Sequence, residues 1–339
     1  MKELQISVII CTYNRAAILE NAIISLINQT IANNLYEVIV VDNNSKDNTK
    51  ELVEKLKVGH PNVNYIFEEK PGLSNARNAG YLHAKGSFVG YMDDDAKASS
   101  NYIEEILKII EDVNPDIFGG PIFPYYECEK PDWFKDVYGT YSSYDKTGWV
   151  TTLEQYLSGS NITFRKSLLF ECGGFDPRLG MKGNLRRYGE ETQIVYWAHQ
   201  QNKKIYYSTG LIVYHLVPVY KLNPLFFLTS AYESGRDHFL VNDSSIDPLN
   251  EIVLKDITFH LIHQFEELYN IAKEQYDKEI LKSNQLEIQN FVVEKVSPLL
   301  VNMGYQIRRF NSLNNRKRSV VGKLLDFNLR RLFLKFKKL

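Results

Sequence analysis

The chain has 339 residues, of which 44% are hydrophobic and 24% charged, and its formal net charge is −1. These values are ordinary for a soluble globular protein, and the length suits one large domain with an appendage. Cys11, Cys128 and Cys172 form no closely spaced pair, which argues against structural zinc and a disulfide framework. No run approaches the roughly 20 apolar residues of a membrane-spanning helix and no signal peptide is evident, so we expect a cytoplasmic protein.

Apolar runs typical of buried strands alternate with segments of helical spacing in the N-terminal part. The runs lie at 6–10, 38–41, 64–67 and 88–92, and helices are predicted at 18–27, around 52–56, from 72 and from 99 onward. Asp47 or Asn48 is the expected cap of the second helix, and Ser74 that of the third. The alternation predicts an α/β fold with a mostly parallel sheet and helices on both faces.

Three adjacent carboxylates, Asp93, Asp94 and Asp95, end the fourth apolar run. Burying three negative charges without compensating partners would be energetically unfavourable. We therefore place them at the carboxyl end of the strand, where α/β sheets bind ligands. Asp93 and Asp95 are two residues apart, so a bend can aim both at one Mg²⁺ or Mn²⁺ ion. The alternatives are a solvated acidic loop and a helix cap at Asp95.

Polar residues also follow the first two predicted strands, at Thr12, Tyr13 and Asn14 and at Asp42. Parallel strands end at one edge of the sheet, so these residues together indicate a nucleotide site. The chain has no GxGxxG after its first strand and no GxxxxGK[ST] motif, which leaves a carboxylate-bound metal to hold the phosphates.

In these segments the chain resembles the GT-A fold glycosyltransferases, a Rossmann-like group, and within them the inverting enzymes of family 2. The segments that carry the resemblance are 7–15, 40–49, 72–80, 93–95, 159–165, 173–176 and 189–191. The resemblance implies a catalytic domain at 1–220, with a nucleotide-sugar-binding half at 1–120 and an acceptor half at 121–220. A helical region at 221–339 is expected to follow, from the helical spacing there.

The resemblance implies that Thr12 and Tyr13 contact the nucleotide base and that Asp42 accepts its imide hydrogen, a contact that suits uracil. Arg77 would face the base or the diphosphate, because its guanidinium offers a fixed fork of donors. The alternatives are that Asp42 closes a turn with Ser45 and that Arg77 is solvated. The implied nucleotide-binding residues are Thr12, Tyr13, Asn14, Asp42, Arg77 and Asp93.

By the same resemblance, Asp93 would meet the ribose and Asp95 would coordinate the metal. Family members commonly have an aspartate where this chain has Ala96, and Asp94 is left without a role. His215 follows an apolar strand where some related enzymes add a metal or diphosphate contact, the alternative being a structural histidine. The expected metal ligands are Asp95, Asp93 and His215, with Mg²⁺ or Mn²⁺ as the cofactor.

Inverting transfer needs a carboxylate that takes the proton of the attacking acceptor hydroxyl as the nucleoside diphosphate leaves. Glu190 and Glu191 stand where the family shows an acidic pair, so Glu191 is the expected base and Glu190 holds the acceptor or tunes its neighbour. The alternative is that both acids complement the dipole of the helix that starts there. Aromatic residues crowd the segment 124–149, either as a cover for the acceptor or as core.

Residues 308–339 contain eleven lysines and arginines and one aspartate, so this basic tail carries +10 and the rest of the chain −11. Its mixture of cations and large apolar residues predicts a helix at an anionic membrane surface, which suggests peripheral attachment to the inner face of the cell membrane. The alternatives are docking on its own domain or on a second subunit. No recognition motif for nucleic acid accompanies the tail.

The expected function is transfer of a hexose or N-acetylhexosamine from a nucleotide-diphosphate donor, a UDP-sugar, to a glycan or lipid-linked oligosaccharide in polysaccharide biosynthesis. Two other functions stay open. Nucleotidyl transfer on a related fold predicts a first loop rich in glycine and lysine, unlike residues 12–15. A binding module that has lost catalysis is the non-enzyme alternative.

Overall fold

The computed structural model describes residues 4–142, 144–152, 157–183, 189–223 and 292–313, with 226, 227, 230, 231, 234, 235, 263 and 290. The chain divides into two compact units. The first unit comprises Met1–Glu127, Asp136–Arg186 and Glu190–Val217, and the second comprises Cys128–Lys135, Arg187–Gly189 and Pro218–Leu339. The second unit thus takes two short segments from within the predicted catalytic domain.

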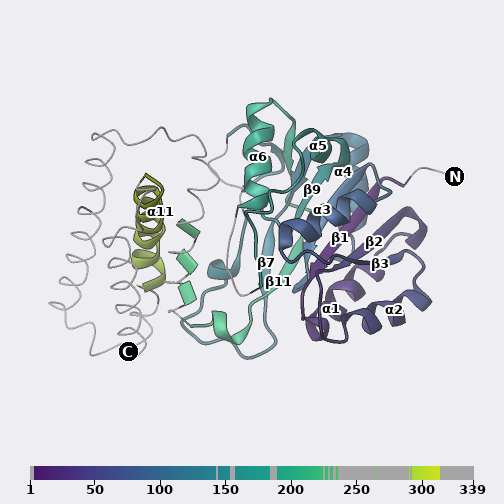
Figure 1. Ribbon diagram of the computed structural model, residues 1–339, viewed down its shortest axis with the longest axis horizontal. Coiled ribbons are helices and arrows are strands. Elements are labelled where there is room, and N and C mark those ends of the chain that lie inside the picture. The colour runs from purple at the N-terminus through teal and green to yellow at the C-terminus, as the bar shows by residue number, and fades with distance from the viewer. Residues whose placement is uncertain are drawn as a thin grey trace. The chain divides into compact units, whose positions relative to one another are not determined.

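An eight-stranded sheet in the order β3-β2-β1-β4-β9-β6-β10-β8 is the centre of the first unit (Figure 1). The first four strands are parallel, whereas β9 runs antiparallel to both β4 and β6. The mostly parallel sheet that the sequence predicted is therefore confirmed. The strands are β1 (Ile6–Thr12), β2 (Tyr36–Asp42), β3 (Val63–Phe67), β4 (Phe88–Asp93), β6 (Ile117–Gly119), β8 (Gly148–Trp149), β9 (Ile162–Arg165) and β10 (Ile205–Tyr207).

A three-stranded sheet in the order β5-β11-β7 completes the first unit. β11 (Val213–Leu216) runs antiparallel to β5 (Ala96–Ala98) and parallel to β7 (Ile122–Tyr125). In this register His215 lies opposite Ala96, and Leu216 N donates to the carbonyl of Asp95 at 2.8 Å. Strand pairing thus carries a distant histidine to the end of the acidic triplet.

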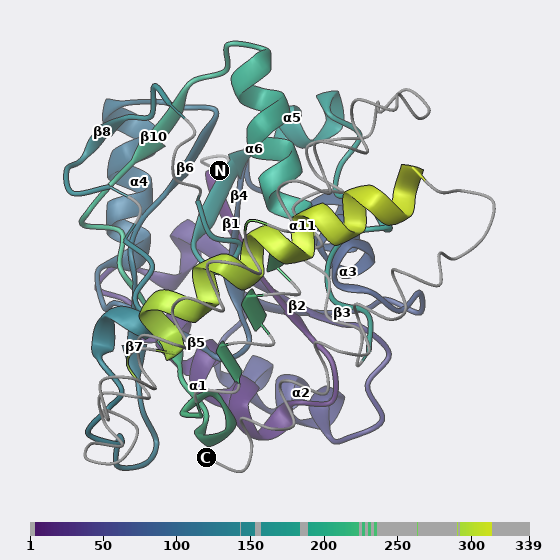
Figure 2. The same cartoon turned by 90° about the vertical axis from the view of Figure 1, so that its left-hand side faces the viewer.

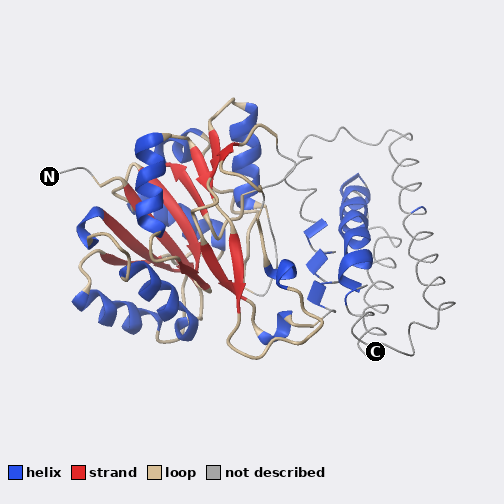
Figure 3. Cartoon of the chain, turned by 180° about the vertical axis from the view of Figure 1, so that it is seen from behind, coloured by secondary structure: helices blue, strands red, loops and turns tan. Residues whose placement is uncertain are grey.

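Helices cover both faces of the large sheet, because successive strand residues point to opposite sides. On one face, Val8 and Ile10 of β1 belong to a core with α1 (Ala16–Ile27), α2 (Thr49–Gly59) and α4 (Tyr102–Asp112). On the other face, Ile9 belongs to a core with α3 (Leu73–His83), α5 (Lys166–Glu171) and α6 (Glu190–Gln200). Figure 3 shows the strands between the helices, and Figures 1 and 2 both show α1 beside α2. The prediction of helices on both faces is confirmed.

Short helices complete the described part of the chain. In the first unit these are the 3₁₀ segments η1 (Asn33–Leu35) and η2 (Asp136–Gly139). The second unit has η3 (Val219–Lys221), the π segment η4 (Val292–Val296) and the helix α11 (Ser297–Leu313). Among the described helices, none combines the length and apolar character needed to cross a bilayer. The predicted helices between 236 and 289, apart from 263, and the tail from 314 lie outside the described residues.

The starts of α2 and α3 can be compared with the predicted caps. Asn48 occupies the capping position of α2, but its side chain makes no capping hydrogen bond. The residue that precedes α3 is Gly72, whose φ of 129° is open to glycine, and the hydroxyl of Ser74 donates instead to Leu179 O at 2.8 Å. Ser74 is therefore not the cap. Before α2, Asp47 accepts hydrogen bonds from the backbone N–H groups of Thr49 and Ala16, so it ties that helix to the start of α1.

Asn161, which precedes β9, fastens the two sheets together. Its buried amide donates to the carbonyls of Pro121 at 3.1 Å and Leu211 at 2.7 Å, and its oxygen accepts from the hydroxyl of Tyr102 at 3.1 Å. Pro121 leads into β7 and Leu211 leads toward β11. This side chain therefore supports the strand that carries His215.

We expect Asn161→Ala to lower the free energy of unfolding by about 2 to 4 kcal/mol, because it leaves buried polar groups without partners. Urea unfolding monitored by circular dichroism measures the change. Asn101→Ala is the matched control, because Asn101 is exposed and its side chain makes no capping hydrogen bond to α4. Equal stability losses in the two variants would contradict the role of Asn161.

Candidate active site

The polar residues after β1, β2 and β4 lie at one edge of the large sheet. The register places Thr12 beside Asp42 and Cys11 beside Asp93. Because these strands are parallel, their carboxyl ends open on the same side, where α/β folds bind ligands. The predicted nucleotide-binding residues and the acidic triplet thus share one edge.

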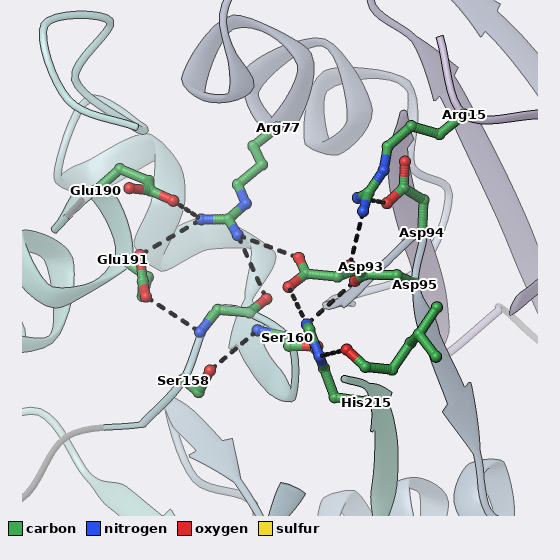
Figure 4. A network of polar contacts seen from close by, with 12 residues as sticks. Arg15, Arg77, Asp93, Asp94, Asp95, Ser158, Ser160, Glu190, Glu191 and His215 are labelled. Atoms are coloured by element: carbon green, nitrogen blue, oxygen red, sulfur yellow. Dashed lines mark hydrogen bonds and ion pairs between the residues drawn. The ribbon is translucent and has the colours of Figure 1, made fainter. Parts of the chain in front are cut away.

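Asp93, Asp95 and His215 form a candidate cation site, with one ligand atom from each lying within 4.8 Å of the others. His215 Nε2 is 3.1 Å from Asp95 Oδ1 and 3.6 Å from Asp93 Oδ2 (Figure 4). Its Nδ1 lies 3.0 Å from the carbonyl of Leu216, and a proton donated there leaves the lone pair of Nε2 for a metal. Two carboxylates and an imidazole are suitable ligands for Mn²⁺. Mg²⁺ would be bound mainly by the two carboxylates, because it prefers oxygen ligands.

Burial and neighbouring charges act differently on the first two aspartates. Burial opposes ionisation of Asp93, but the neighbouring His215 and the nearby charge of Arg77 leave the pKa of Asp93 below its ordinary value. Burial, together with the charge of Asp95, raises the pKa of Asp94 to about 7, against the opposing effect of Arg15. The triplet is therefore not a run of equivalent solvated carboxylates.

Arg15 pairs with the acidic triplet, and sequence reasoning had assigned it no role. Its Nη1 lies 2.5 Å from Asp94 Oδ1 and its Nη2 lies 2.9 Å from Asp95 Oδ2. The hydroxyl of Thr12 donates to Asp94 Oδ2 at 2.8 Å. Asp95 does not cap the following helix, because α4 begins only at Tyr102. The sequence did contain a signal that Arg15 belongs to the site, because Arg15 ends the same polar turn as Thr12.

The buried carboxylate of Asp42 closes the turn after β2. Its Oδ1 accepts from the backbone N–H of Ser45 at 2.8 Å, and its Oδ2 accepts from the hydroxyl of Tyr65 at 2.8 Å. This is the turn that the sequence offered as the alternative to a base contact. The contact between Asp42 and a nucleotide base stays a prediction.

The turns after β1 and β2 are joined through Asn14. Its backbone has a φ of 54°, its N–H donates to Ser45 Oγ at 2.9 Å, and its Oδ1 accepts from the N–H of Lys46 at 2.7 Å. Tyr13 stands 44% exposed beside this junction. An exposed ring on a braced turn is available for stacking on a planar ligand.

Arg77 is 4% exposed and lies among three carboxylates, so the alternative of a solvated arginine is wrong. Its Nη1 is 2.5 Å from Glu190 Oε1 and 3.5 Å from Glu191 Oε2. Its Nη2 lies 3.8 Å from Asp93 Oδ1 (Figure 4). The rings of Tyr91 and Phe175 lie 5.7 Å and 5.5 Å from the guanidinium. Arg77 therefore links the glutamate pair to the candidate cation site.

The glutamate pair opens α6, and each member has different surroundings. Glu191 Oε1 accepts from the backbone N–H of Gly159 at 3.2 Å, while its buried Oε2 accepts no hydrogen bond from the described residues. Burial, with the adjacent charge of Glu191, raises the pKa of Glu190 to about 8 against the effect of Arg77. Gly159 was missed as a site residue; its missing side chain leaves space for Arg77, because a Cβ there would lie 2.6 Å from Nη2.

The aromatic residues of 124–149 divide between core and surface. Trp133 and Phe134 are buried and pack with Phe227 in the second unit. Trp149 of β8 is half-exposed and packs edge-on against Tyr206. The structure thus assigns part of the segment to ordinary packing.

Residues 7–173 match the family model described as Glycosyl transferase family 2. This part of the chain belongs to the family. A glucosyl-dolichyl phosphate glucuronosyltransferase of Haloferax volcanii is 27% identical over 229 residues, or 64% of this chain and 71% of the relative. A GalNAc(5)-diNAcBac-PP-undecaprenol beta-1,3-glucosyltransferase of Campylobacter jejuni is 33% identical over 117 residues, 34% of this chain and 37% of the relative.

Solved structures support the GT-A fold of this family 2 chain. TarS of S. aureus, residues 1–349 in complex with UDP, has a TM-score of 0.53 at 19% identity, covering 92% of each chain. The mannosyltransferase PcManGT of Pyrobaculum calidifontis, in complex with GDP-Man and Mn²⁺, has a TM-score of 0.58 at 19% identity, covering 92% of this chain and 88% of the other. The family and fold predicted from the sequence are confirmed.

We expect Glu190→Gln to change how stability depends on pH. The pKa of Glu190 in the folded chain, about 8, lies above the ordinary 4.5, so folding favours the protonated form of this side chain. The free energy of unfolding is therefore highest, as far as Glu190 contributes to it, below pH 4.5, and it falls as the pH rises to 8. The glutamine variant should therefore gain stability relative to the native chain over this interval, by at least about 1.4 kcal/mol, the equivalent of one pKa unit. Thermal unfolding between about pH 5 and 9 measures the difference. A difference that stays constant with pH would contradict the assignment.

Proposed function

We propose that this family 2 chain is an inverting, metal-dependent glycosyltransferase that moves a hexose or N-acetylhexosamine from a UDP-sugar to a glycan or lipid-linked oligosaccharide. One observation carries the proposal: the Arg77 guanidinium reaches both Glu191 and Asp93. A proton acceptor and a candidate cation site therefore face the same part of the sheet edge. Single displacement needs these two groups on opposite sides of one anomeric carbon.

Asp93, Asp95 and His215 would hold Mg²⁺ or Mn²⁺, which when bound supplies positive charge to the leaving diphosphate. Glu191 takes the proton of the acceptor hydroxyl while that oxygen attacks the anomeric carbon. Its Oε2 is buried 3.5 Å from Arg77 Nη1 but accepts no hydrogen bond from the described residues, so it keeps a lone pair for this proton. The N–H of Gly159 and the charge of Arg77 hold this carboxylate in place.

The nucleotide lies along the turns after β1 and β2 in this proposal. Tyr13 stacks on the base, Asp42 accepts its imide hydrogen, and Thr12 and Asn14 shape the turn that receives it. The exposed ring of Tyr13 and the hydrogen bonds that brace Asn14 support this arrangement. The complex of TarS with UDP supports a uridine donor, whereas PcManGT binds GDP-Man, so both donor classes belong in the test.

A donor panel tests the proposed reaction. We expect the full chain to release UDP from a UDP-sugar in the presence of Mn²⁺ or Mg²⁺. Replacement of the base, Glu191→Gln, should lower turnover by about 10²- to 10⁴-fold while UDP and Mn²⁺ still bind, because the change removes only proton transfer. Asp95→Asn should instead weaken Mn²⁺-dependent binding of UDP. Coupled UDP detection and isothermal titration calorimetry give the two readouts.

Four results would contradict this proposal or part of it, each in a different way. Release of pyrophosphate from a nucleoside triphosphate would indicate nucleotidyl transfer. Turnover unaffected by Glu191→Gln would remove that residue as the base. Binding of UDP without turnover on any donor would favour a module that has lost catalysis. Preference for GDP-mannose over every UDP-sugar would overturn only the uridine assignment.

We also propose that the basic tail at 308–339 holds the enzyme at the inner face of the cell membrane. Eleven cations against one acid give this segment +10, which suits an anionic leaflet. The two relatives above whose names specify a dolichyl or undecaprenol carrier support a lipid-linked acceptor. Attachment would bring the site close to such a substrate and is consistent with a role in polysaccharide biosynthesis.

Neutralising three tail lysines, Lys335, Lys337 and Lys338, to glutamine should weaken binding to vesicles of phosphatidylserine and phosphatidylcholine. The expected loss is on the order of 100-fold, because each lysine near an anionic surface contributes about 1 kcal/mol. Vesicle cosedimentation measures it. The control replaces three exposed lysines of α2, Lys50, Lys55 and Lys57, by glutamine. Equal effects of the two triple changes, or no vesicle binding by the native chain, would contradict membrane attachment.

A further inference from the structure

Arg15, Asp94 and Thr12 form a hydrogen-bonded group beside the candidate cation site, and we name this group the Arg15 clamp. Arg15 contacts Asp94 through Nη1 and Asp95 through Nη2, at 2.5 and 2.9 Å. Thr12 Oγ1 holds the other oxygen of Asp94 at 2.8 Å. The described hydrogen bonds of Asp94 therefore go to Thr12 and Arg15 and not to His215, although Asp94 lies between two candidate ligands in the sequence.

The clamp determines how the carboxylate of Asp95 is oriented. Arg15 holds Oδ2, and the opposite oxygen, Oδ1, lies 3.1 Å from Nε2 of His215. A carboxylate held at one oxygen by a planar guanidinium has lost rotation about its last bond, so the other oxygen points in a defined direction. The backbone of Asp95 is held as well, since its carbonyl accepts from the N–H of Leu216 at 2.8 Å.

We propose that Arg15 and Asp94 are positioning residues that preset Asp95 Oδ1 for a divalent cation and thereby set the affinity of the site. The inference rests on the proposed metal-dependent function and assigns a role to the middle carboxylate of the triplet. Asp94 anchors Arg15 and does not bind the ion. Partners of this kind, which hold a ligand without touching the metal, change metal affinity by about 10- to 100-fold.

Charge alone makes the opposite prediction for Arg15. Removing a cation beside a divalent-ion site strengthens attraction for the ion, whereas releasing the carboxylate of Asp95 weakens binding. A single replacement of Arg15 mixes these two effects. At pH 8, above the pKa of about 7 of Asp94, the double variant Arg15→Gln/Asp94→Asn removes one positive and one negative charge, so the net charge of the site stays nearly the same. A loss of affinity in that variant then measures orientation.

The experiment is titration of the full chain with Mn²⁺ alone, without nucleotide, followed by calorimetry and by the electron paramagnetic resonance signal of free Mn²⁺. We expect the double variant to bind Mn²⁺ about 10- to 100-fold more weakly than the native chain. Arg15→Lys with Asp94 retained should bind at an intermediate affinity, because an ammonium lacks the planar fork that reaches both carboxylates. Thermal unfolding of each variant shows whether the chain still folds.

The matched control is Arg165→Gln/Asp116→Asn. Arg165 is 29% exposed, close to the 36% of Arg15, whereas Asp116 is 25% exposed against 5% for Asp94. The pair lies at the other end of β4, opposite Phe88. The control removes the same charges and should leave Mn²⁺ affinity unchanged. Unchanged or tighter Mn²⁺ binding by a folded Arg15→Gln/Asp94→Asn variant overturns the clamp alone. Absence of Mn²⁺ binding by the native chain overturns the metal site and the clamp with it.

Discussion

The compensation of buried negative charge is the constraint on which the site depends. Five carboxylates, from residues 93–95 and from the pair 190–191, are held by the two arginines Arg15 and Arg77. Burial of so many carboxylates would be very unfavourable without these partners. Each arginine is shared, so Arg15 joins two members of the triplet and Arg77 joins the triplet to the glutamate pair. The excess negative charge that remains suits a divalent cation and a proton acceptor.

Strand pairing determines which charged side chains lie next to one another in the site. The pairing of β11 with β5 places His215 opposite Ala96, immediately after the triplet, and Asn161 braces the segments that lead to these strands. On the other face, α3 contributes Arg77 and α6 contributes Glu190 and Glu191. A chemical site spread over more than two hundred positions is therefore held by two sheets and two helices. Its precision comes from rigid elements, which is what catalysis by positioning requires.

The members of each acidic group have distinct surroundings, and these suggest distinct tasks. Asp94 is turned toward Arg15 and Thr12, while Asp93 and Asp95 face His215. Glu190 is buried against Arg77, while Glu191 keeps an oxygen that accepts no hydrogen bond from the described residues. In each group one carboxylate makes the shortest contact with an arginine, and a neighbour that also contacts this arginine is the proposed ligand or base. The proposed reaction and the proposed clamp both follow from this division.

The sequence by itself determined the α/β fold, the places of the first four strands, and the position of the triplet at the end of β4, because apolar periodicity and turn residues are local properties. It also showed the family resemblance, which predicted His215 as a metal ligand and the glutamate pair as the site of the base. Only the tertiary structure decided that Arg15 pairs with Asp94 across 79 positions, that Arg77 is buried among three carboxylates, and that Asp42 closes a turn with Ser45. Such pairings depend on strand order and helix placement, so no local pattern encodes which charge meets which.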